Sequence, residues 1–399
     1  MATERLYYDD STLTEFDATV TGVREHEGRP AVTLDRTAFY PTSGGQPFDV
    51  GTLGAASVVD VVDDEEGGEI VHVLDRAVEQ GSAVRGSIDK ARRLDHMQQH
   101  TGQHILSAAF EKLQQARTVS FHLGAETSTI DLDQEVSATA VAAAERLANE
   151  VVWDDRAIDI RYVTEDEAAL LPLRKEPKRT GRLRLIEVPG CDLSACGGTH
   201  VPRTGVIGMI AVAGVERFKG GLRVSFLCGG RALARFGRMR GTLDECIKRI
   251  SVHPDELPAA IGRLHDELKA QRTAIRAQQE KLAGAEAAAL RASAEVADGA
   301  ALVVAYVPGW DSAGLKLLAS TLTSGAGVVA ALVGDGNPAP VVIARSDDGR
   351  IDAGEILRAL LAELGGKGGG KPGMAQGAVS AEAAPVVAEL RTRLLAALA

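Results

Sequence analysis

The stretch DHMQQHTGQHILSAAF, residues 95–110, has the pattern of a helix that carries chemistry. His96, His100 and His104 recur at every fourth residue, so on a helix they project from neighbouring positions of one face. Two imidazoles at i and i+4 can bind one metal ion, but a zinc protease would also need a Glu directly after the first of them, which is absent. The stretch therefore predicts a metal-binding helix of another kind, with three polar surface histidines as the alternative.

The segment CGGTH, Cys196–His200, supplies a second pair of ligands. It offers a thiolate and an imidazole four residues apart, and its two glycines let the backbone fold tightly between them. A His pair on a helix and a Cys/His pair on a turn together provide four ligands of the kind that zinc prefers. We therefore expect one zinc ion per chain. Cys191 is a spare ligand, although a buried free cysteine is the better interpretation of it.

The sequence around these clusters predicts an α+β chain in four parts. Short β-branched runs separated by Gly, Asp and Pro predict a small β-barrel over residues 1–90. Residues 91–245 alternate helical and strand patterns and predict a mixed α+β core that bears the zinc site. Residues 246–298 predict a helical arm with an apolar stripe formed by Ile261, Leu264, Leu268, Ile275 and Leu282. Residues 299–399 predict a C-terminal α/β domain with buried strands.

The composition excludes several classes of protein. Hydrophobic residues make up 45% and charged residues 25% of the 399 residues, ordinary values for a soluble globular protein. The N-terminus lacks the apolar segment of a secretory signal, and no run approaches the roughly 20 apolar residues of a membrane span. Four cysteines are too few for a disulfide scaffold, and a net charge of −11 argues against indiscriminate nucleic-acid binding. We therefore expect a cytoplasmic protein that does not bind membranes.

Four quoted motifs together resemble one family. HTGQH followed by CGGTH, and preceded by FYPTSGGQPFDVGTL, resembles the editing region of alanyl-tRNA synthetase and of its free-standing AlaX relatives. GGKGGGKPGMAQGA, which begins at Gly365, resembles the glycine-rich element of the C-Ala domain of that synthetase. The resemblance covers nearly the whole chain in the same order. Because the expected barrel begins near the first residue, no aminoacylation domain would precede it, and the chain resembles the long form of AlaX.

The resemblance implies a hydrolase for mischarged alanine tRNA. The family hydrolyses the ester that joins serine, and in some members glycine, to the terminal adenosine. An alanine-sized activation pocket cannot exclude glycine and rejects one extra hydroxyl poorly, so a second hydrolytic site is needed. By motif, the zinc ligands are His100, His104, Cys196 and His200. Zinc either anchors the substrate or polarises it and its water, and the second role needs an open coordination position, so we expect His200 to be displaceable.

The remaining site residues are assigned less directly. TVSFHLG, residues 118–124, lies where the family places pocket residues, so Ser120 and His122 are candidates for contact with the substrate or water. This segment departs from the synthetase, which carries a Gln-bearing segment there. Thr199 is a candidate for contact with the serine hydroxyl, and His96 for a supporting role, although hydrogen-bonded structural histidines are an equal alternative for His96 and His122. Four histidines belong to no cluster and are expected at the surface: His26, His72, His253 and His265.

Two segments are candidates for contact with alanine tRNA. RKEPKRTGRLR, residues 174–184, has six basic residues and one acidic residue, a net charge of +5. It could bind acceptor-stem phosphates through Arg174, Lys175, Lys178, Arg179 and Arg182, with a solvated loop as the alternative. In the glycine run, backbone N–H groups with Lys367 and Lys371 could hold phosphate, and by resemblance this element binds the outer corner of the tRNA. A flexible linker is the alternative there.

Two other functions stay open. A non-catalytic, zinc-stabilised RNA-binding module would use the same four ligands structurally. A metal-dependent hydrolase of another ester or of a phosphodiester would need a carboxylate cluster for two metals, and the sequence has no such cluster. The helical arm or the C-terminal domain could also form a homodimer. The sequence does not decide between serine and glycine as the substrate.

Overall fold

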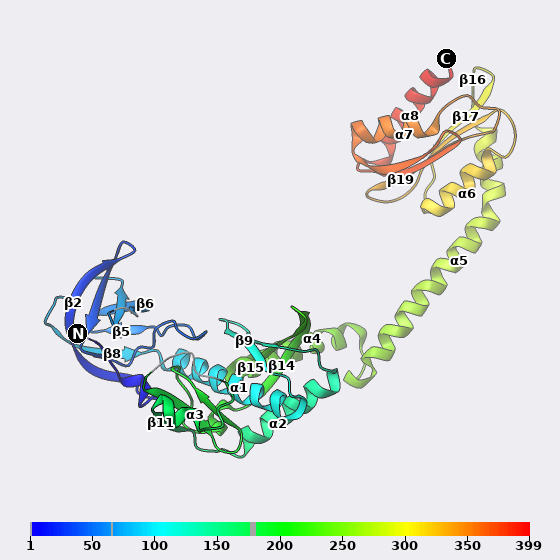
Figure 1. Cartoon of the computed structure of the whole chain (residues 1–399). Helices are drawn as coiled ribbons and strands as arrows, with labels where there is room; N and C mark the ends of the chain where they lie inside the picture. Colours follow the sequence, from blue (N-terminus) through cyan, green and yellow to red (C-terminus); the bar gives the residue numbers. More distant parts are fainter. Residues whose placement is uncertain (1, 65–66, 176–180) are drawn as a thin grey trace. The chain divides into compact units, whose positions relative to one another are not determined.

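The computed structural model describes residues 2–64, 67–175 and 181–399 (Figure 1). The chain forms two compact units, Met1–Cys246 and Ile247–Ala399. The mixed α+β class expected from the sequence is confirmed, since the described residues form eight α-helices and several β-sheets. The finer division into four domains stays a prediction. Within the described part of the chain, no helix combines the length and apolar character that crossing a bilayer requires.

Six strands at the start of the chain close into a barrel, in the order β2-β3-β7-β6-β5-β8. Their bounds are β2 (Glu15–His26), β3 (Arg29–Leu34), β5 (Gly51–Leu53), β6 (Ala56–Asp64), β7 (Glu69–Leu74) and β8 (Ala83–Ile88). Alternate residues along β2, including Phe16 and Val20, are buried and belong to one apolar core with Leu34, Leu53 and Leu74. Two short strands, β1 (Glu4–Arg5) and β4 (Arg36–Thr37), pair in parallel.

Helix α1 (Lys90–Gln114) carries the histidine cluster. It begins after Asp89, whose side chain accepts hydrogen bonds from the backbone N–H groups of Ala91 and Arg92. Its apolar residues share a core with α2 (Ala138–Trp153) and a four-stranded sheet ordered β14-β15-β10-β9. Gly102 permits this packing, because a Cβ atom there would collide with the sulfur of Cys228 on the sheet. The strands are β9 (Thr118–Leu123), β10 (Ser128–Leu132), β14 (Ile210–Phe218) and β15 (Gly221–Cys228).

A buried ion pair joins the barrel to α1. Nη2 of Arg93 lies 2.5 Å from Oδ2 of Asp49, and the two side chains are 1% and 0% exposed. Arg93 also donates hydrogen bonds to the backbone carbonyls of Ser11 and Ala38. Because Asp49 lies on the loop between β4 and β5, the pair holds that loop against the helix that carries the histidines.

A three-stranded sheet, ordered β11-β12-β13, positions the CGGTH turn. Its strands are β11 (Asp159–Val163), β12 (Leu183–Val188) and β13 (Asp192–Ala195). Cys196 follows β13 directly, and Arg184 on β12 donates hydrogen bonds to the carbonyls of Cys196 and Gly198. These bonds fix the course of the turn. The short helix α3 (Glu165–Ala169) follows β11, and α4 (Gly229–Ile250) follows β15.

The second unit has a six-stranded sheet with helices on both faces. Its strand order is β16-β17-β18-β19-β21-β20, with only β17 and β18 parallel among the described pairs. One face packs against α5 and α6, the other against α7 and α8. The strands are β16 (Glu295–Ala297), β17 (Ala300–Tyr306), β18 (Val328–Val333), β19 (Ala339–Arg345), β20 (Gly366–Lys371) and β21 (Met374–Val379). The helices are α5 (Leu257–Ala292), α6 (Ser312–Leu322), α7 (Ala353–Leu364) and α8 (Ala383–Leu398).

The expected helical arm corresponds to α5. The five apolar side chains of its stripe are 47–58% exposed. The described chain thus leaves the stripe about half uncovered, and a dimer contact along it stays a prediction.

Candidate metal centre

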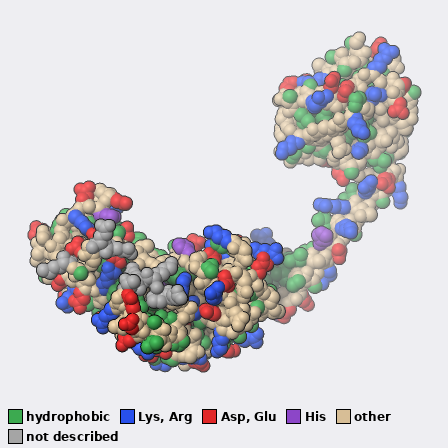
Figure 2. All heavy atoms as spheres, in the orientation of Figure 1, with side chains coloured by type: hydrophobic (Ala, Val, Ile, Leu, Met, Phe, Trp, Pro, Cys, Tyr) green, Lys and Arg blue, Asp and Glu red, His purple; other side chains and the backbone are tan. Residues whose placement is uncertain are grey.

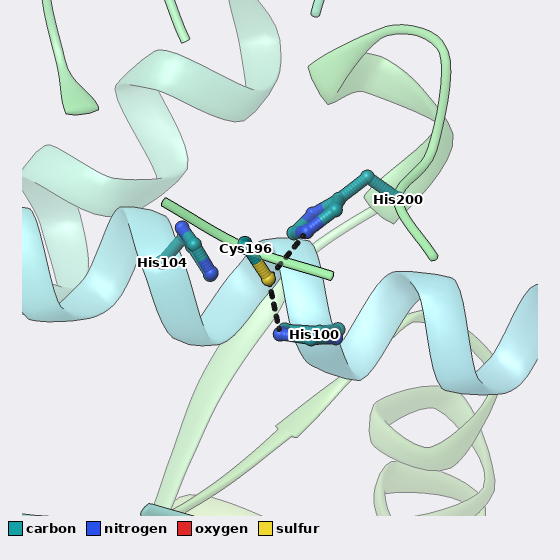
Figure 3. Close-up of side chains that lie close together, drawn as sticks. All are labelled: His100, His104, Cys196 and His200. Atoms are coloured by element: carbon teal, nitrogen blue, oxygen red, sulfur yellow. Dashed lines mark hydrogen bonds between the residues drawn. The ribbon is translucent and has the colours of Figure 1, made fainter. Parts of the chain in front are cut away.

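The four expected metal ligands converge in the first unit (Figure 3). His100 and His104 project from successive turns of α1, while Cys196 and His200 lie on the turn after β13. Their ligand atoms all lie within 4.8 Å of one another. The sulfur of Cys196 is 3.4 Å from Nε2 of His100 and 3.3 Å from Nε2 of His200. The convergence predicted from the sequence is therefore confirmed.

The donor set and its spacing fit a zinc ion. Zinc bonds of about 2.3 Å to sulfur and 2.0–2.1 Å to nitrogen, at a tetrahedral angle, place those two ligand atoms roughly 3.5 Å apart. The two sulfur–nitrogen distances are close to this value. Three of the ligands are buried residues, and Cys196 is a partly exposed residue.

Each imidazole is held through its other nitrogen. Nδ1 of His100 lies 2.8 Å from Oε1 of Gln46, and Nδ1 of His104 lies 2.7 Å from Oδ2 of Asp192. Nδ1 of His200 lies 3.1 Å from the hydroxyl of Thr101. An acceptor at Nδ1 fixes the proton there and leaves Nε2 with its lone pair free for a metal. This arrangement is typical of metal-binding histidines.

Charges around the centre favour the metal-binding form of the cysteine. Burial raises the pKa of the Cys196 thiol, but the His100 and His200 rings outweigh it and hold that pKa well below its ordinary value. Burial lowers the pKa of His200 to about 3, so this ring is neutral near pH 7. Burial also lowers the pKa of His104, but Asp192 and Cys196 together raise it to about 9. The centre thus combines a thiolate and a carboxylate, which favour a bound cation.

Glycines let the two loops approach the histidines closely. A Cβ atom at Gly198 would collide with the His100 ring, and one at Gly45 would come within 2.9 Å of the Phe121 ring. Gly45 is exposed, as are Gly44 on the same loop and Gly197 on the CGGTH turn. Three glycines on these two loops therefore expose backbone beside the centre.

The supporting candidates occupy different positions. Thr199 is 0% exposed, and its hydroxyl accepts a hydrogen bond of 2.8 Å from Nε2 of Gln46. His96 is also buried, which lowers its pKa to about 4, and its Nδ1 has no hydrogen-bond partner among the described residues. On β9, Phe121 faces the metal ligands, with its ring centroid 5.9 Å from that of His100. Because strand side chains alternate, Ser120 and His122 lie on the opposite face, where Ser120 donates to Asp131.

The predicted tRNA contacts near residue 174 fall into three groups. Arg174 forms an ion pair of 2.5 Å with Asp192, so its guanidinium supports the metal centre. Arg182 lies over the Tyr162 ring, 4.7 Å from its centroid, and Lys175 is exposed. The other two predicted residues, Lys178 and Arg179, lie outside the described residues.

The predicted contacts in the glycine run lie on strand β20 of the second unit. Lys367 and Lys371 are exposed, as are all residues of this strand, and β20 forms the edge of the six-stranded sheet. The flexible linker that was the alternative interpretation is therefore excluded.

Sequence reasoning missed several residues and misplaced one. Gln46, Thr101 and Asp192 hold the three imidazoles; Gln46 and Thr101 lie within the quoted motifs, whereas Asp192 lies outside them. His72 was expected at the surface but is 0% exposed inside the barrel unit. Its Nε2 lies 2.8 Å from the Thr37 hydroxyl and its Nδ1 3.4 Å from the Val32 carbonyl, which explains how a polar ring is accommodated.

Three protein families match separate parts of the chain. Residues 2–92 match the family "tRNA synthetases class II (A)", and residues 183–223, which include Cys196 and His200, match the "Threonyl and Alanyl tRNA synthetase second additional domain". Residues 299–398 match the "DHHA1 domain".

Individual relatives extend the match over the chain. The alanine–tRNA ligase of Natronomonas pharaonis is 35% identical over 94% of this chain, which spans 42% of that ligase. The crystal structure of the C-Ala domain from Aquifex aeolicus alanyl-tRNA synthetase matches 26% of this chain, and the match covers 96% of that domain. The sequence identity is 22% and the TM-score is 0.24, so this likeness carries no argument. The alanyl-tRNA editing protein AlaX-L of Pyrococcus horikoshii is 31% identical over 391 residues. Because that match covers 95% of both proteins, the chain belongs to the AlaX-L family of alanyl-tRNA editing proteins.

Proposed function

We propose that this protein hydrolyses the ester bond of mischarged alanine tRNA, with seryl-tRNA as the main substrate and glycyl-tRNA as the second. The observation that carries the proposal is the cluster of three imidazole Nε2 atoms and one thiolate, with each imidazole held at Nδ1. The membership of the chain in a family of alanyl-tRNA editing proteins supports the type of reaction. The substrate follows from the need to remove amino acids that an alanine pocket admits.

The cluster would hold one zinc ion through His100, His104, Cys196 and His200. When bound, zinc supplies a positive charge that anchors or polarises the ester and its water. The protein's own residues set the geometry for this. Gln46 and Asp192 orient the imidazoles of His100 and His104, and Arg174 holds the Asp192 carboxylate in place.

The exposed rim of the centre suits the 3′ end of a tRNA. Its bare backbone at Gly44, Gly45 and Gly197 allows a ribose and its ester to approach. Two partly exposed aromatic rings, Tyr8 and Phe121, lie beside these glycines. Unpaired bases commonly stack on such rings, so we assign Tyr8 and Phe121 to the terminal adenosine.

The buried candidates then take supporting roles. Thr199 is closed off from solvent and bonded to Gln46, so we assign it to positioning that glutamine instead of contacting the serine hydroxyl. Ser120 and His122 lie on the outer face of β9, where they would contact RNA approaching the centre and not the reacting ester. Contact with tRNA phosphates by Lys175, Arg182, Lys367 and Lys371 remains part of the proposal.

One observation favours a second function, a zinc-stabilised RNA-binding module. Four protein ligands can close the coordination sphere of zinc, as in structural sites. The test is to incubate the full chain with alanine tRNA charged with serine, glycine or alanine and to follow deacylation. Editing predicts rapid loss of serine, slower loss of glycine and retention of alanine. Binding of all three tRNAs without hydrolysis would support the module, and equal loss of alanine would mean a hydrolase without a proofreading role.

A further inference from the structure

A groove of about 690 Å³ lies on the first unit, away from the metal ligands. One wall is helix α4, and the floor is formed by β14 and β15 of the four-stranded sheet. The hairpin between β9 and β10 closes one end through Ala125–Thr127. Ser225 on β15 lies opposite Thr129 on β10, which lies opposite His122 on β9, so the groove is on the face of the sheet that bears His122.

Three arginines of α4 face this groove. Arg231, Arg235 and Arg238 are spaced i, i+4 and i+7, which places them along one side of the helix. Arg231 is fixed by an ion pair of 2.6 Å with Asp95 and by a hydrogen bond to the carbonyl of Gly124. Arg235 and Arg238 are exposed, and neither forms an ion pair with a carboxylate of the described chain. Two guanidinium groups are therefore available to an incoming anion.

The remaining lining favours an extended anionic chain. Its floor and wall carry small side chains at Ala213, Gly214, Ser225 and Ala234, and a Cβ atom added at Gly214 would meet nothing within 4 Å. Glu126 is the one carboxylate among the residues that line the groove. Figure 2 shows Lys and Arg side chains, with some Asp and Glu, on the surface of the first unit. The groove is thus open, lined by small side chains and positively charged.

Strand β9 connects the groove to the metal centre. It is the edge strand of the sheet, and its C-terminal end leads into the hairpin that closes the groove. Phe121 on β9 faces His100, while the adjacent His122 faces the groove side. Strands β10 and β9 lie between the groove floor and this edge of the sheet, so an RNA strand that leaves the groove would cross these two strands to reach the face that bears Phe121.

We propose that this groove binds the sugar–phosphate backbone of the RNA strand whose 3′ end enters the metal centre. The inference rests on the proposed function for the identity of the RNA. Arg235 and Arg238 would each bind a phosphate, since the guanidinium fork matches phosphate oxygens. Arg231, whose charge is paired with Asp95, would hold the hairpin at the end of the groove through its hydrogen bond to the Gly124 carbonyl.

The test measures binding of an RNA minihelix that has the acceptor-stem sequence of alanine tRNA and a CCA end carrying no amino acid. The full chain with Arg235→Ala and Arg238→Ala is compared with Arg240→Ala, an exposed arginine of the same helix that does not line the groove. The double variant should bind about tenfold more weakly, and its salt dependence should flatten by about 0.7 in slope for each lost phosphate contact. The Arg240 variant should bind like the unmodified chain.

Equal RNA affinity in the double variant and the unmodified chain would overturn the proposal. So would a loss of RNA affinity in the Arg240 variant as large as that in the double variant, because it would show a general effect of charge instead of binding in the groove. Because this RNA carries no amino acid, the binding result does not depend on hydrolysis. Hydrolysis of 3′-O-seryl-adenosine, which lacks the rest of the strand, should continue at an unchanged rate in the double variant. Failure of every chain to hydrolyse that ester, with groove binding intact, would contradict the proposed reaction and not the groove.

Discussion

Nδ1 of His104 lies 2.7 Å from a carboxylate oxygen of Asp192, and both groups are buried. The other oxygen of Asp192 accepts hydrogen bonds from Arg174 and Ser194. Burial raises the pKa of Asp192, but His104 and Arg174 outweigh it and keep the group ionised. The carboxylate therefore fixes the orientation of His104 before any metal binds.

Replacing Asp192 by Asn should lower zinc affinity by about 10- to 100-fold, because the orientation and basicity of His104 depend on this carboxylate. Zinc affinity is measured by competition with a chromogenic chelator. Asp154→Asn is a matched control, since Asp154 pairs with Arg156 at an exposed position. If the Asp192 variant kept the affinity of the unmodified chain, His104 would not depend on Asp192.

Gln46 should have a similar role for His100. Its Oε1 accepts hydrogen bonds from Nδ1 of His100 and from the backbone N–H of Thr199. Gln46→Ala removes this acceptor and should weaken zinc binding, also by about 10- to 100-fold. Gln46→Glu keeps an acceptor at the same place and should restore most of the affinity. Equal weakening in both variants would show that the loss comes from disturbed packing.

The buried pair of Arg93 and Asp49 should be needed for the stability of the first unit. Arg93→Met leaves Asp49 as an unpaired buried charge and should lower the free energy of unfolding by about 3–5 kcal/mol. The double variant Arg93→Met, Asp49→Leu removes both charges and should recover part of that loss. Urea denaturation of the unmodified chain, of Arg93→Met, of Asp49→Leu and of the double variant measures the effect. If the double variant lost as much free energy of unfolding as the two single variants lose together, Arg93 and Asp49 would not be coupled.

The barrel should lose stability in mild acid through His72. Burial lowers the pKa of His72 to about 4 from 6.5 in the unfolded chain, so the unfolded chain binds a proton that the folded barrel excludes. The contribution of neutral His72 to the free energy of unfolding is therefore fully present above pH 6.5. It is lost as the pH falls to 4, which lowers the free energy of unfolding by on the order of 3 kcal/mol. His72→Gln should reduce this loss, whereas His26→Gln, at a partly exposed position, should not. An unchanged pH profile in the His72 variant would contradict this assignment.

The two lysines of β20 should contribute to binding of whole tRNA but not of the acceptor minihelix. Lys367→Ala with Lys371→Ala should weaken binding of full-length alanine tRNA and reduce its salt dependence, because two positive charges at the exposed edge strand are lost. Binding of the minihelix should not change, since by our proposal the strand contacts the outer corner of the tRNA. Equal binding of the whole tRNA by the variant would exclude a role for this edge.

Local patterns were the part of this structure that sequence reasoning predicted well. The helical pattern expected over residues 95–110 lies within α1 (Lys90–Gln114), because the His spacing and an apolar face are both properties of one helix. The convergence of HTGQH and CGGTH could be predicted because these two short motifs already contain all four residues that can bind one metal ion. The identity of the metal is still a prediction.

Contacts between distant segments could not be predicted in this way. Asp192 is 88 residues from His104 and Gln46 is 54 residues from His100, and nothing in their local sequence indicates the partner. His72 lies in a strand whose neighbours are apolar, and a hydroxyl from another strand is what permits its burial. The arginines of α4 are ordinary helix residues until the sheet opposite them forms a groove.

The most direct test of the account measures zinc content and seryl-tRNA hydrolysis together, in the unmodified full chain and in His104→Ala. We predict one zinc ion per unmodified chain, loss of hydrolysis when a chelator removes it, and recovery when zinc is returned. The His104 variant should lack both zinc and hydrolysis. Full hydrolysis by a chain shown to be free of metal, or undiminished zinc in the His104 variant, would contradict the central claim that these four side chains form the working centre.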